Sequence, residues 1–434
     1  MKDEAGACDP ISDAVLARYL ERTLRSREAM VRAARVMPGG NTRTTTFHPP
    51  YPQVFASGAG ATLTDADGNR QIDLFQNGLS LIHGHAHPAL VALAGEVMAG
   101  GSAWSGASER QIAYAAYLLE RLGVDGTVRF ANTGSEAGML AVKLVRARTG
   151  RPLILKFRHA YHGSYPDLEA GLYGAGDVEG RAVIAEFDDI ASVEAALVRH
   201  EGRIAAVMIE PVLFTGRVSA PEEGFLAEVE RLARAVGAMT ILDDCLMLRL
   251  APGGSTERFG LAPDLIVLGK FAGGGTPLGA VIGRGDTLGS LDPTRPGALF
   301  HGGSFNGNVL GCALGHAALE MLDAPAIAAL DAAAETIERM VSVHAQAHSM
   351  DVSITRAGSV CGIAFPGDIV RHEDDPAAMG LSAIFHLAAA NEGVLLGPGG
   401  LIGTSTALDP EMARTAAAAL CRAFDTLAPL IQRQ

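Results

Sequence analysis

A lysine that directly follows an apolar run is the first candidate for chemistry in this sequence. Residues 265–268 are β-favouring and apolar, and Lys270 and the glycines 273–275 come just after them. A lysine at a strand end is most often a solvated cation whose stem lies on the surface. If it faces a closed site instead, its amine is desolvated and reactive, and the glycines allow backbone or ligand to approach closely. The ends of the other strands must decide between these interpretations.

Polar residues also stand at the ends of three further strand-like runs. Residues 132–135 (Asn-Thr-Gly-Ser) follow one run, Glu210 ends a second, and Asp243 and Asp244 end a third. In open α/β sheets, ligands bind beyond the carboxyl ends of the strands. We therefore expect these groups and Lys270 to converge on one site.

Gly134 and Ser135 stand where a strand is expected to pass into a helix. Free backbone N–H groups and the positive end of the helix dipole suit a phosphate there. The alternative is that Ser135 simply caps the helix. The segment has neither the lysine of a P-loop nor a GxGxxG pattern, which disfavours a nucleoside triphosphate or a dinucleotide as ligand.

Asp243 ends a buried strand, where an unpaired carboxylate would be costly. It should therefore face a cation or a polar site, and an ion pair with Arg249 is the simpler alternative. A phosphate-binding helix start at Gly134 and Ser135 (the phosphate cup), a buried carboxylate and a strand-end lysine together match the needs of pyridoxal 5'-phosphate. That cofactor uses a lysine imine, an anion site and an aspartate partner for its ring nitrogen.

The elements that must position these groups alternate between strands and helices. The pattern starts at a capping-box signal, Ser108 with Gln111, and includes helical segments at residues 135–150 and 221–237. This alternation predicts an α/β fold with a mainly parallel sheet covered by helices. The strand-like runs are residues 127–132, 153–157, 205–210, 239–244, 265–270 and 279–283.

The N-terminal segments precede this alternation. Helical spacing predicts one helix from about Ser12 to Val36, stopped by the sequence MPGG, as an N-terminal arm. Residues 61–75 read as a hairpin about an Asp67-Gly68 turn signal.

The C-terminal segments suggest a second, smaller α+β domain. Beyond about Asp323 come long alanine-rich helices, two short strands within residues 352–365, and a final helix from Pro410. The expected division is an N-terminal arm and hairpin that belong to the small domain, a large cofactor-binding domain, and a C-terminal small domain. These parts are residues 1–80, 81–323 and 324–434.

Composition limits the class of protein. The chain has 434 residues, of which 48% are hydrophobic and 19% charged, which is typical of a folded protein. The formal charge of −13 argues against nucleic-acid and anionic-membrane partners. The first ten residues hold no apolar signal region, and no apolar run approaches the roughly 20 residues that cross a bilayer. We therefore expect a cytoplasmic protein.

Neither the cysteines nor the histidines indicate a metal. The five cysteines are odd in number and lack CxxC spacing, so reduced thiols are expected instead of disulfides or a zinc site. His83, His85, His87 and His162 are interpreted as structural, because no acidic or cysteine partner at metal spacing accompanies them.

Six ordered motifs resemble the class III, fold-type I pyridoxal-phosphate-dependent aminotransferases. They are NTGSEA, YHG, IEP, LDD, LGKFAGGG and GGSFNGN, and the likeness runs from MPGG to the last helix. Within the class, the chain looks like the glutamate-1-semialdehyde aminomutase-like branch. It is most similar to β-phenylalanine-type aminotransferases through MPGGNTR and RLAPGG. The resemblance implies a mainly parallel seven-stranded sheet in the large domain.

The resemblance also implies roles for these residues. Lys270 would hold the cofactor as a Schiff base and then move a proton between the substrate's Cα or Cβ and the cofactor's C4′. Asp243 would keep the ring nitrogen protonated, with Glu210 nearby in support. Gly134 and Ser135 would bind the phosphate.

Three further residues take roles from the resemblance alone. Tyr161 would stack on the cofactor ring, although the sequence fits a core tyrosine equally well. Ser304 of GGSFNGN stands where a threonine of the neighbouring subunit usually completes the phosphate site, which implies a homodimer with shared active sites. Arg43 would bind the substrate carboxylate.

The chain departs from the family at several positions. Asp244 and Cys245 replace the usual glutamate and valine, but neither change removes a required group. The segment after YHG lacks the long gating loop of the aminomutase, and LGPGGLIGTS lacks its acidic residue. Gly399 stands where β-phenylalanine-type enzymes have an arginine, so Arg43 is left as the carboxylate-binding group.

Three functions are compatible with these residues. The leading hypothesis is an aminotransferase that moves an amino group from a carboxylate-bearing amine, such as a β-amino acid, to a 2-oxo acid. The second is a glutamate-1-semialdehyde 2,1-aminomutase-like isomerase or an epimerase. The third is a pyridoxal-phosphate-binding protein without turnover, against which Lys270 and Asp243 count because binding alone needs neither.

Overall fold

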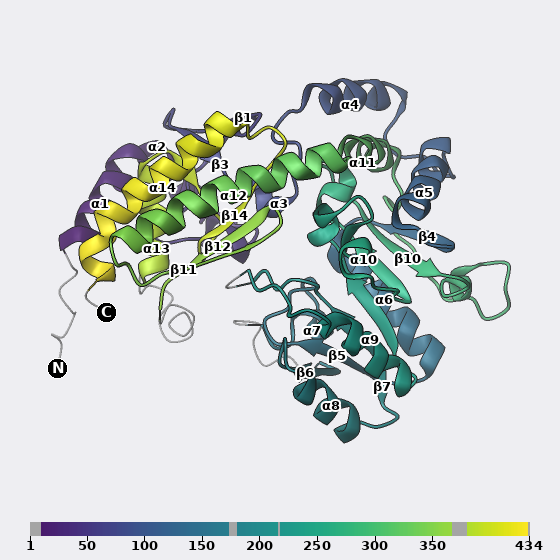
Figure 1. The fold of residues 1–434 in the computed structure, drawn as a ribbon. Helices are drawn as coiled ribbons and strands as arrows, with labels where there is room; N and C mark the ends of the chain where they lie inside the picture. Colours follow the sequence, from purple (N-terminus) through teal and green to yellow (C-terminus); the bar gives the residue numbers. More distant parts are fainter. Residues whose placement is uncertain (1–9, 173–179, 216–217, 367–379, 433–434) are drawn as a thin grey trace.

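A seven-stranded sheet forms the middle of the chain in the computed structural model, which describes residues 10–172, 180–215, 218–366 and 380–432 (Figure 1). The strand order is β4-β10-β9-β8-β7-β5-β6, and β10 alone runs antiparallel to its neighbours. The predicted α/β fold with a mainly parallel seven-stranded sheet is confirmed. The strands are β4 (Gly126–Ala131), β5 (Leu153–Phe157), β6 (Ala182–Ala185), β7 (Ile204–Ile209), β8 (Met239–Asp243), β9 (Leu265–Leu268) and β10 (Gly279–Arg284).

Both faces of this sheet are buried, which explains why its strands read as continuous apolar runs. Alternate residues of β7 point to opposite faces. Ala206 and Met208 pack with α6, whereas Val207 and Ile209 pack with α8 and α9. The helices of this part are α4 (Pro88–Gly100), α5 (Glu109–Leu122), α6 (Gly134–Thr149), α7 (Pro166–Glu169), α8 (Ile190–Arg199), α9 (Phe225–Ala235), α10 (Gly254–Phe259) and α11 (Val309–Met321).

The two ends of the chain pack together away from the large sheet (Figure 1). Tyr19 of the N-terminal arm shares one hydrophobic cluster with Phe385 and Phe424 of the C-terminal helices. We propose that this unit is the small domain expected from the sequence. Its helices are α1 (Pro10–Arg22), α2 (Leu24–Ala33), α12 (Ala324–Ala347), α13 (Leu381–Asn391) and α14 (Pro410–Ile431), and the short α3 (Gln76–Leu79) follows β3.

Two small sheets complete this unit. The predicted hairpin is formed by β2 and β3, and β3 also pairs in parallel with β13 from the C-terminal part. The hairpin is therefore joined to the C-terminal segment by backbone hydrogen bonds. The strands are β1 (Phe55–Ala59), β2 (Thr62–Asp65), β3 (Arg70–Asp73) and β13 (Val394–Leu395) in one sheet, and β11 (Ser353–Ala357), β12 (Val360–Ala364) and β14 (Leu401–Gly403) in the other.

The single N-terminal helix predicted from Ser12 to Val36 is wrong, because the chain breaks between α1 and α2 at Thr23. The hydroxyl of Thr23 donates to the carbonyl of Tyr19 (2.7 Å), and its backbone leaves helical geometry. The carboxylate of Asp67 accepts hydrogen bonds from the backbone N–H groups of Arg25 (2.6 Å) and Ser26 (3.0 Å). The hairpin turn thus caps the second helix, which a local helical pattern cannot reveal.

The helix start predicted at Ser108 is confirmed. Its hydroxyl accepts a hydrogen bond from the backbone N–H of Gln111 (3.1 Å) and caps α5. Within the described ranges, no single helix is long and apolar enough to cross a membrane, and only the α11–α12 pair, bent by 75°, passes that test together.

Candidate active site

The carboxyl ends of β7, β8 and β9 lie side by side, because these strands are neighbours in the sheet. Ile209 pairs with Leu242, so Glu210 and Asp243 leave adjacent strands at the same level. Asp243 in turn pairs with Val267 of β9, the strand that leads to Lys270. Three of the four polar strand ends singled out in the sequence are thus brought to one edge of the sheet.

Lys270 has an unusual backbone. Its φ of 51° lies in the left-handed region, where a non-glycine residue costs about 1–3 kcal/mol and is usually held for function. It opens a 3₁₀ turn, Lys270–Gly273, directly after β9. Among the described residues, its Nζ has no hydrogen-bond partner, while its charge acts on Asp243 and Glu210. The amine is therefore free to form a bond with a ligand.

Asp243 is buried, and its partner is His162. The Nδ1 of His162 lies 2.8 Å from Oδ2 of Asp243, and the backbone N–H of Cys245 donates to Oδ1 (3.2 Å). Burial alone would raise the pKa of Asp243, but the hydrogen bond from His162 and the charge of Lys270 hold that pKa below its ordinary value. Burial lowers the pKa of His162. A neutral His162 therefore donates its Nδ1–H to an ionised Asp243.

The alternative pairing of Asp243 with Arg249 is wrong. The guanidinium of Arg249 donates to Ser359 Oγ (2.7 Å) and to the carbonyl of Thr404, both outside the large sheet. Arg249 lies six residues beyond Asp243, within the 3₁₀ turn Met247–Leu250 that follows the strand end. Arg249 is a fully buried structural link.

His162 is the site residue that sequence reasoning did not connect with Asp243. The two residues are 81 positions apart, and only the YHG motif beside Tyr161 pointed to this segment. His162 is fully buried, and its Nε2 has no hydrogen-bond partner in the part of the chain that the structure describes. Because its Nδ1 forms a hydrogen bond with Asp243, His162 positions the Asp243 carboxylate.

Glu210 is a second buried carboxyl group beside Asp243. Burial, followed by the charge of Asp243, raises the pKa of Glu210 to about 8. Its Oε2 accepts a hydrogen bond from the backbone N–H of Tyr161 (3.1 Å). Glu210 is therefore neutral near pH 7, and it ties the loop that carries Tyr161 and His162 to the end of β7.

The α6 N-terminus forms the proposed phosphate cup. Thr133, not Ser135, is the N-cap, since its hydroxyl accepts from the backbone N–H of Glu136 (3.1 Å). The alternative role of Ser135 as the cap is therefore wrong. Ser135 Oγ accepts from the backbone N–H of Ser164 instead (3.3 Å). The first N–H groups of the helix have no partner within the helix and suit an anion.

A glycine lets the neighbouring loop reach this cup. Gly163 has a φ of 120°, and an added Cβ there would lie 2.4 Å from Ser135 Oγ. A second close contact joins the cup to the other strand ends. An added Cβ on Gly269 would lie 3.0 Å from Gly134 Cα and 3.1 Å from Cys245 Sγ. The cup, the residue before Lys270 and the residues after Asp243 are therefore packed against one another.

This arrangement fits pyridoxal phosphate. The cup offers backbone N–H groups to a phosphate, and Asp243 offers an ionised, desolvated carboxylate to a ring nitrogen. Lys270 offers an amine that no protein group occupies among the described residues. An anion site, a carboxylate and a free amine are the three groups that this cofactor requires.

Lys156 is a further residue that the sequence analysis missed. It is fully buried in β5, and its Nζ donates to the backbone carbonyls of Ala160 (2.8 Å) and Leu168 (2.5 Å). Burial lowers the pKa of Lys156 to about 8. The segment between its two acceptors carries Tyr161 and His162, so Lys156 fixes the loop that faces the cup. A lysine inside an otherwise apolar strand was the available signal.

The remaining predicted residues, Tyr161, Ser304 and Arg43, are exposed. Tyr161 is 37% exposed beside the cup, where its ring is open to a ligand. Ser304 is exposed on the loop before α11 and makes no hydrogen bond within the described residues. Arg43 is exposed before a 3₁₀ turn, Thr44–Thr46, and its guanidinium contacts no acceptor within the described ranges.

The departures from the family motifs have different structural consequences. Asp244 points away from Asp243 and accepts hydrogen bonds from Ser255 through its backbone N–H (3.0 Å) and its hydroxyl (2.6 Å). Asp244 therefore fixes the start of α10. Cys245 Sγ packs against Gly134, where burial raises the pKa of the thiol. Gly399 is exposed with open space around it.

The chain is similar to proteins of one family over most of its length. The model of the family "Aminotransferase class-III" matches residues 46–168 and 177–414. A glutamate-1-semialdehyde 2,1-aminomutase from Thermomicrobium roseum is 34% identical over 386 residues, which is 84% of this chain and 89% of the relative.

Two transaminases are equally informative. A beta-phenylalanine transaminase from Variovorax paradoxus is 31% identical over 411 residues, which is 92% of this chain and 93% of the relative. The solved structure of a transaminase with PLP bound superposes with a TM-score of 0.87 at 30% identity, and the match covers 94% of this chain and 99% of that one.

Proposed function

The chain belongs to the class-III aminotransferase family, and from this premise we propose that it moves an amino group from a carboxylate-bearing amine to a 2-oxo acid. It is a pyridoxal-phosphate-dependent enzyme of fold type I. The proposed donor is a β-amino acid, because one relative is named a beta-phenylalanine transaminase. The observation that carries the proposal is the placement of Lys270 and Asp243 at adjacent strand ends.

Pyridoxal phosphate supplies a carbonyl carbon that accepts amines and a protonated ring that withdraws electrons. Lys270 is proposed to bind the cofactor through Nζ, and later to move the proton of the substrate carbon. Asp243 is proposed to hold a proton at the ring nitrogen, since a buried, ionised carboxylate stabilises the positive charge there. The Nδ1–H of His162 keeps that carboxylate in place.

The other groups position and shield the site. Gly134 and Ser135 are proposed to bind the phosphate at the α6 N-terminus. Tyr161 is proposed to cover the ring, and its backbone is fixed by Glu210. Lys156 holds the same loop through hydrogen bonds to the carbonyls of Ala160 and Leu168. The loop that would cover one side of the ring is therefore held by hydrogen bonds at both ends.

Arg43 is the proposed anchor for the substrate carboxylate. A planar guanidinium binds a carboxylate through two parallel hydrogen bonds, which a lysine cannot reproduce. Gly399 offers no side chain to share this task. Substrates with a carboxylate should therefore depend on Arg43 much more than simple amines do.

A homodimer with shared active sites is proposed from the loop that carries Ser304. Phe300 and Phe305 flank it and are 85% and 60% exposed, an unusual exposure for aromatic side chains. Association of two copies would bury these rings. It would also allow Ser304 to reach the phosphate cup of the other copy.

An aminomutase is the second candidate, favoured by the relative from Thermomicrobium roseum. The test is to mix the yellow holoenzyme with single amine donors and no acceptor. A transaminase should release an oxo product in an amount equal to the enzyme and lose its yellow absorbance. An aminomutase would instead convert its substrate into an isomeric amine over many turnovers. Release of neither product by any carboxylate-bearing amine would contradict both functions.

The same assay tests the role of Arg43. Arg43→Lys should lower kcat/KM for amino acids by an amount equivalent to a loss of about 1.5–3 kcal/mol of transition-state stabilisation. The kcat/KM for simple amines should barely change. Arg35→Lys, at another exposed position of this segment, is the matched control. Equal losses on both types of substrate would contradict the role of Arg43 without affecting the proposed reaction.

A further inference from the structure

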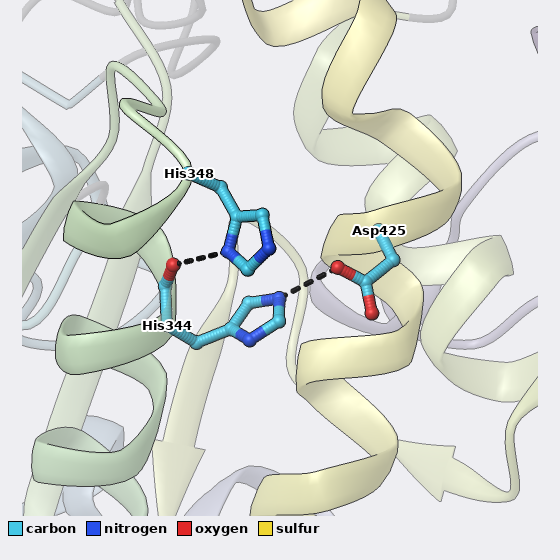
Figure 2. Close-up of side chains that lie close together, drawn as sticks. All are labelled: His344, His348 and Asp425. Carbon is cyan, nitrogen blue, oxygen red and sulfur yellow. Dashed lines mark hydrogen bonds and ion pairs between the residues drawn. The ribbon is translucent and has the colours of Figure 1, made fainter.

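Three metal-ligating side chains gather far from the large sheet, at the ends of two packed helices. His344 lies in the last turn of α12, His348 is the C-cap of that helix, and Asp425 projects from α14. One ligand atom from each lies within 4.8 Å of the others. Figure 2 shows both imidazole rings on the side of α12 that faces Asp425.

The helical spacing brings the two histidines together. Residues four apart lie one above the other on a helix, and the ring centroids of His344 and His348 are 4.3 Å apart. The partner helix is held in place on both sides of the cluster. Cys421 Sγ contacts the carbonyl of Met340 (3.9 Å), and the side chain of Gln432 donates to the carbonyl of His348 (2.7 Å). The fold therefore presents two imidazoles and a carboxylate from a fixed frame.

A hydrogen bond orients the ring of His348 so that it can act as a metal ligand. Nδ1 of His348 lies 2.9 Å from the carbonyl of His344 and donates a hydrogen bond to it, which leaves Nε2 as the ring atom that can bind a metal. A backbone carbonyl in this position is the usual support of a metal-binding histidine. The support orients the ring and selects the tautomer that binds a metal.

His344 and Asp425 form the other hydrogen bond of the cluster. Nε2 of His344 lies 2.7 Å from Oδ1 of Asp425, so one proton occupies the space between two potential ligand atoms. A metal ion can take the place of that proton. An ordinary surface ion pair accounts for these two residues, but it gives no reason for the second imidazole that packs beside them at a tilt.

We propose that His344, His348 and Asp425 bind a divalent first-row transition ion of the Zn²⁺ type. Two imidazoles and a carboxylate are ligands that Zn²⁺ accepts at about 2.0–2.2 Å, with water in the fourth position. Asp425 is 52% exposed and His348 is also exposed, so both side chains can rotate inward to close the 4.8 Å span. The ion would join the end of α12 to α14 and stabilise the unit formed by the two ends of the chain.

The test is direct binding of Zn²⁺ to holoenzyme that has been stripped with a chelator. Equilibrium dialysis should give one ion per chain for the wild type. His348→Ala and Asp425→Asn should each raise the dissociation constant at least about 10-fold, the scale seen when a metal site loses a supporting group. Glu411→Gln removes a carboxylate from the other end of α14 and should leave the constant unchanged.

Co²⁺ provides a second measurement that does not depend on stability. Visible ligand-field bands should appear on addition of Co²⁺ to the wild type and be lost in His348→Ala. A rise in the unfolding temperature with Zn²⁺ should be seen in the wild type and in Glu411→Gln only. Stoichiometric binding that persists in both site variants, or no binding to the wild type at micromolar Zn²⁺, would overturn the proposal.

Discussion

Two of the His–Asp pairs in this protein have nearly the same contact distance, but one is buried and the other is much more exposed. Nδ1 of His162 lies 2.8 Å from Asp243, and Nε2 of His344 lies 2.7 Å from Asp425. The side chains of the first pair are 0% and 6% exposed, and those of the second are 20% and 52% exposed. Contact distance therefore does not predict what a pair can do.

The surroundings decide the chemistry of each pair. In the buried pair, little water screens the charge of Asp243, so that charge acts on Lys270, Lys156 and Glu210. Such a carboxylate can hold a proton on a ligand nitrogen. In the exposed pair, water and salt weaken the attraction, and the shared proton can be exchanged for a metal ion. Desolvation is what separates a catalytic carboxylate from a surface one.

The largest expected effect is on catalysis by the buried pair. Asp243→Asn keeps the shape of the side chain but removes its charge, so the ring nitrogen would lose its partner. We expect kcat to fall at least about 10²-fold, the cost of losing a preorganised electrostatic group. Steady-state assays with the best donor would measure it. Glu411→Gln makes the same chemical change at an exposed position and should keep full activity. If Asp243→Asn retained a tenth of the activity, this role of Asp243 would be wrong.

The loop beside the buried pair should give the next effect. Lys156→Met keeps the length of the side chain but leaves the carbonyls of Ala160 and Leu168 without their donor. We expect roughly a 10- to 100-fold loss of kcat, because a small displacement of Tyr161 and His162 is costly.

Hydrogen exchange separates this effect from general destabilisation. In Lys156→Met, amides of residues 160–168 should exchange faster, while those of α14 should be unchanged. Lys143→Met, at an exposed lysine, serves as the control and should leave exchange in this loop as in the wild type. Unchanged exchange in Lys156→Met would show that Lys156 does not hold the loop.

The two pairs can be compared directly by double-mutant cycles. In cofactor-free protein with a chelator present, alanine substitutions should give a coupling free energy of about 1.5–3 kcal/mol for His162 with Asp243. The pair of His344 with Asp425 should give about 0.2–1 kcal/mol. Urea unfolding of the wild type, the single variants and the double variants measures both values. Equal coupling free energies would mean that burial does not distinguish the pairs.

The last expected effect is a pH dependence of stability. Glu210 has a pKa of about 8 in the folded protein, against an ordinary value of 4.5. Between these values the folded state binds more protons than the unfolded chain, so the contribution of Glu210 to stability falls as pH rises. The slope is at most about 1.4 kcal/mol per pH unit. Glu210→Gln should remove this slope in unfolding experiments between pH 5 and 8, and an identical slope in both proteins would contradict the shift.

The sequence predicted what depends on short-range patterns. Strand ends with polar residues, the hairpin at Asp67-Gly68 and the α6 start follow from apolar runs and turn residues, and all appear in the structure. The break at Thr23 could not be predicted, because it depends on a carboxylate about forty residues away. The strands β1, β6, β13 and β14 were missed, because β1 is rich in small residues and the other three are short, so that none of them shows clear periodicity.

In the candidate site, too, short-range features could be predicted from the sequence and tertiary contacts could not. Asp243 and Lys270 could be selected because each interrupts an apolar run with a charge. The partner of Asp243 could not, since His162 and Arg249 are equally able to pair with a carboxylate until the topology is known. The support from Lys156 is also tertiary, because its acceptors are backbone carbonyls and not side chains.

The central claim is that Lys270 holds the cofactor, and chemical trapping tests it most directly. The sequence has four lysines, Lys2, Lys143, Lys156 and Lys270. Of the three that the structure describes, Lys156 and Lys270 lie at this edge of the sheet. Borohydride reduction of the holoenzyme, followed by peptide mass spectrometry, would locate the cofactor. We predict the pyridoxyl group on Lys270 alone, because Nζ of Lys156 is occupied by two carbonyls. Recovery of that group on Lys156 or on another lysine would contradict the account.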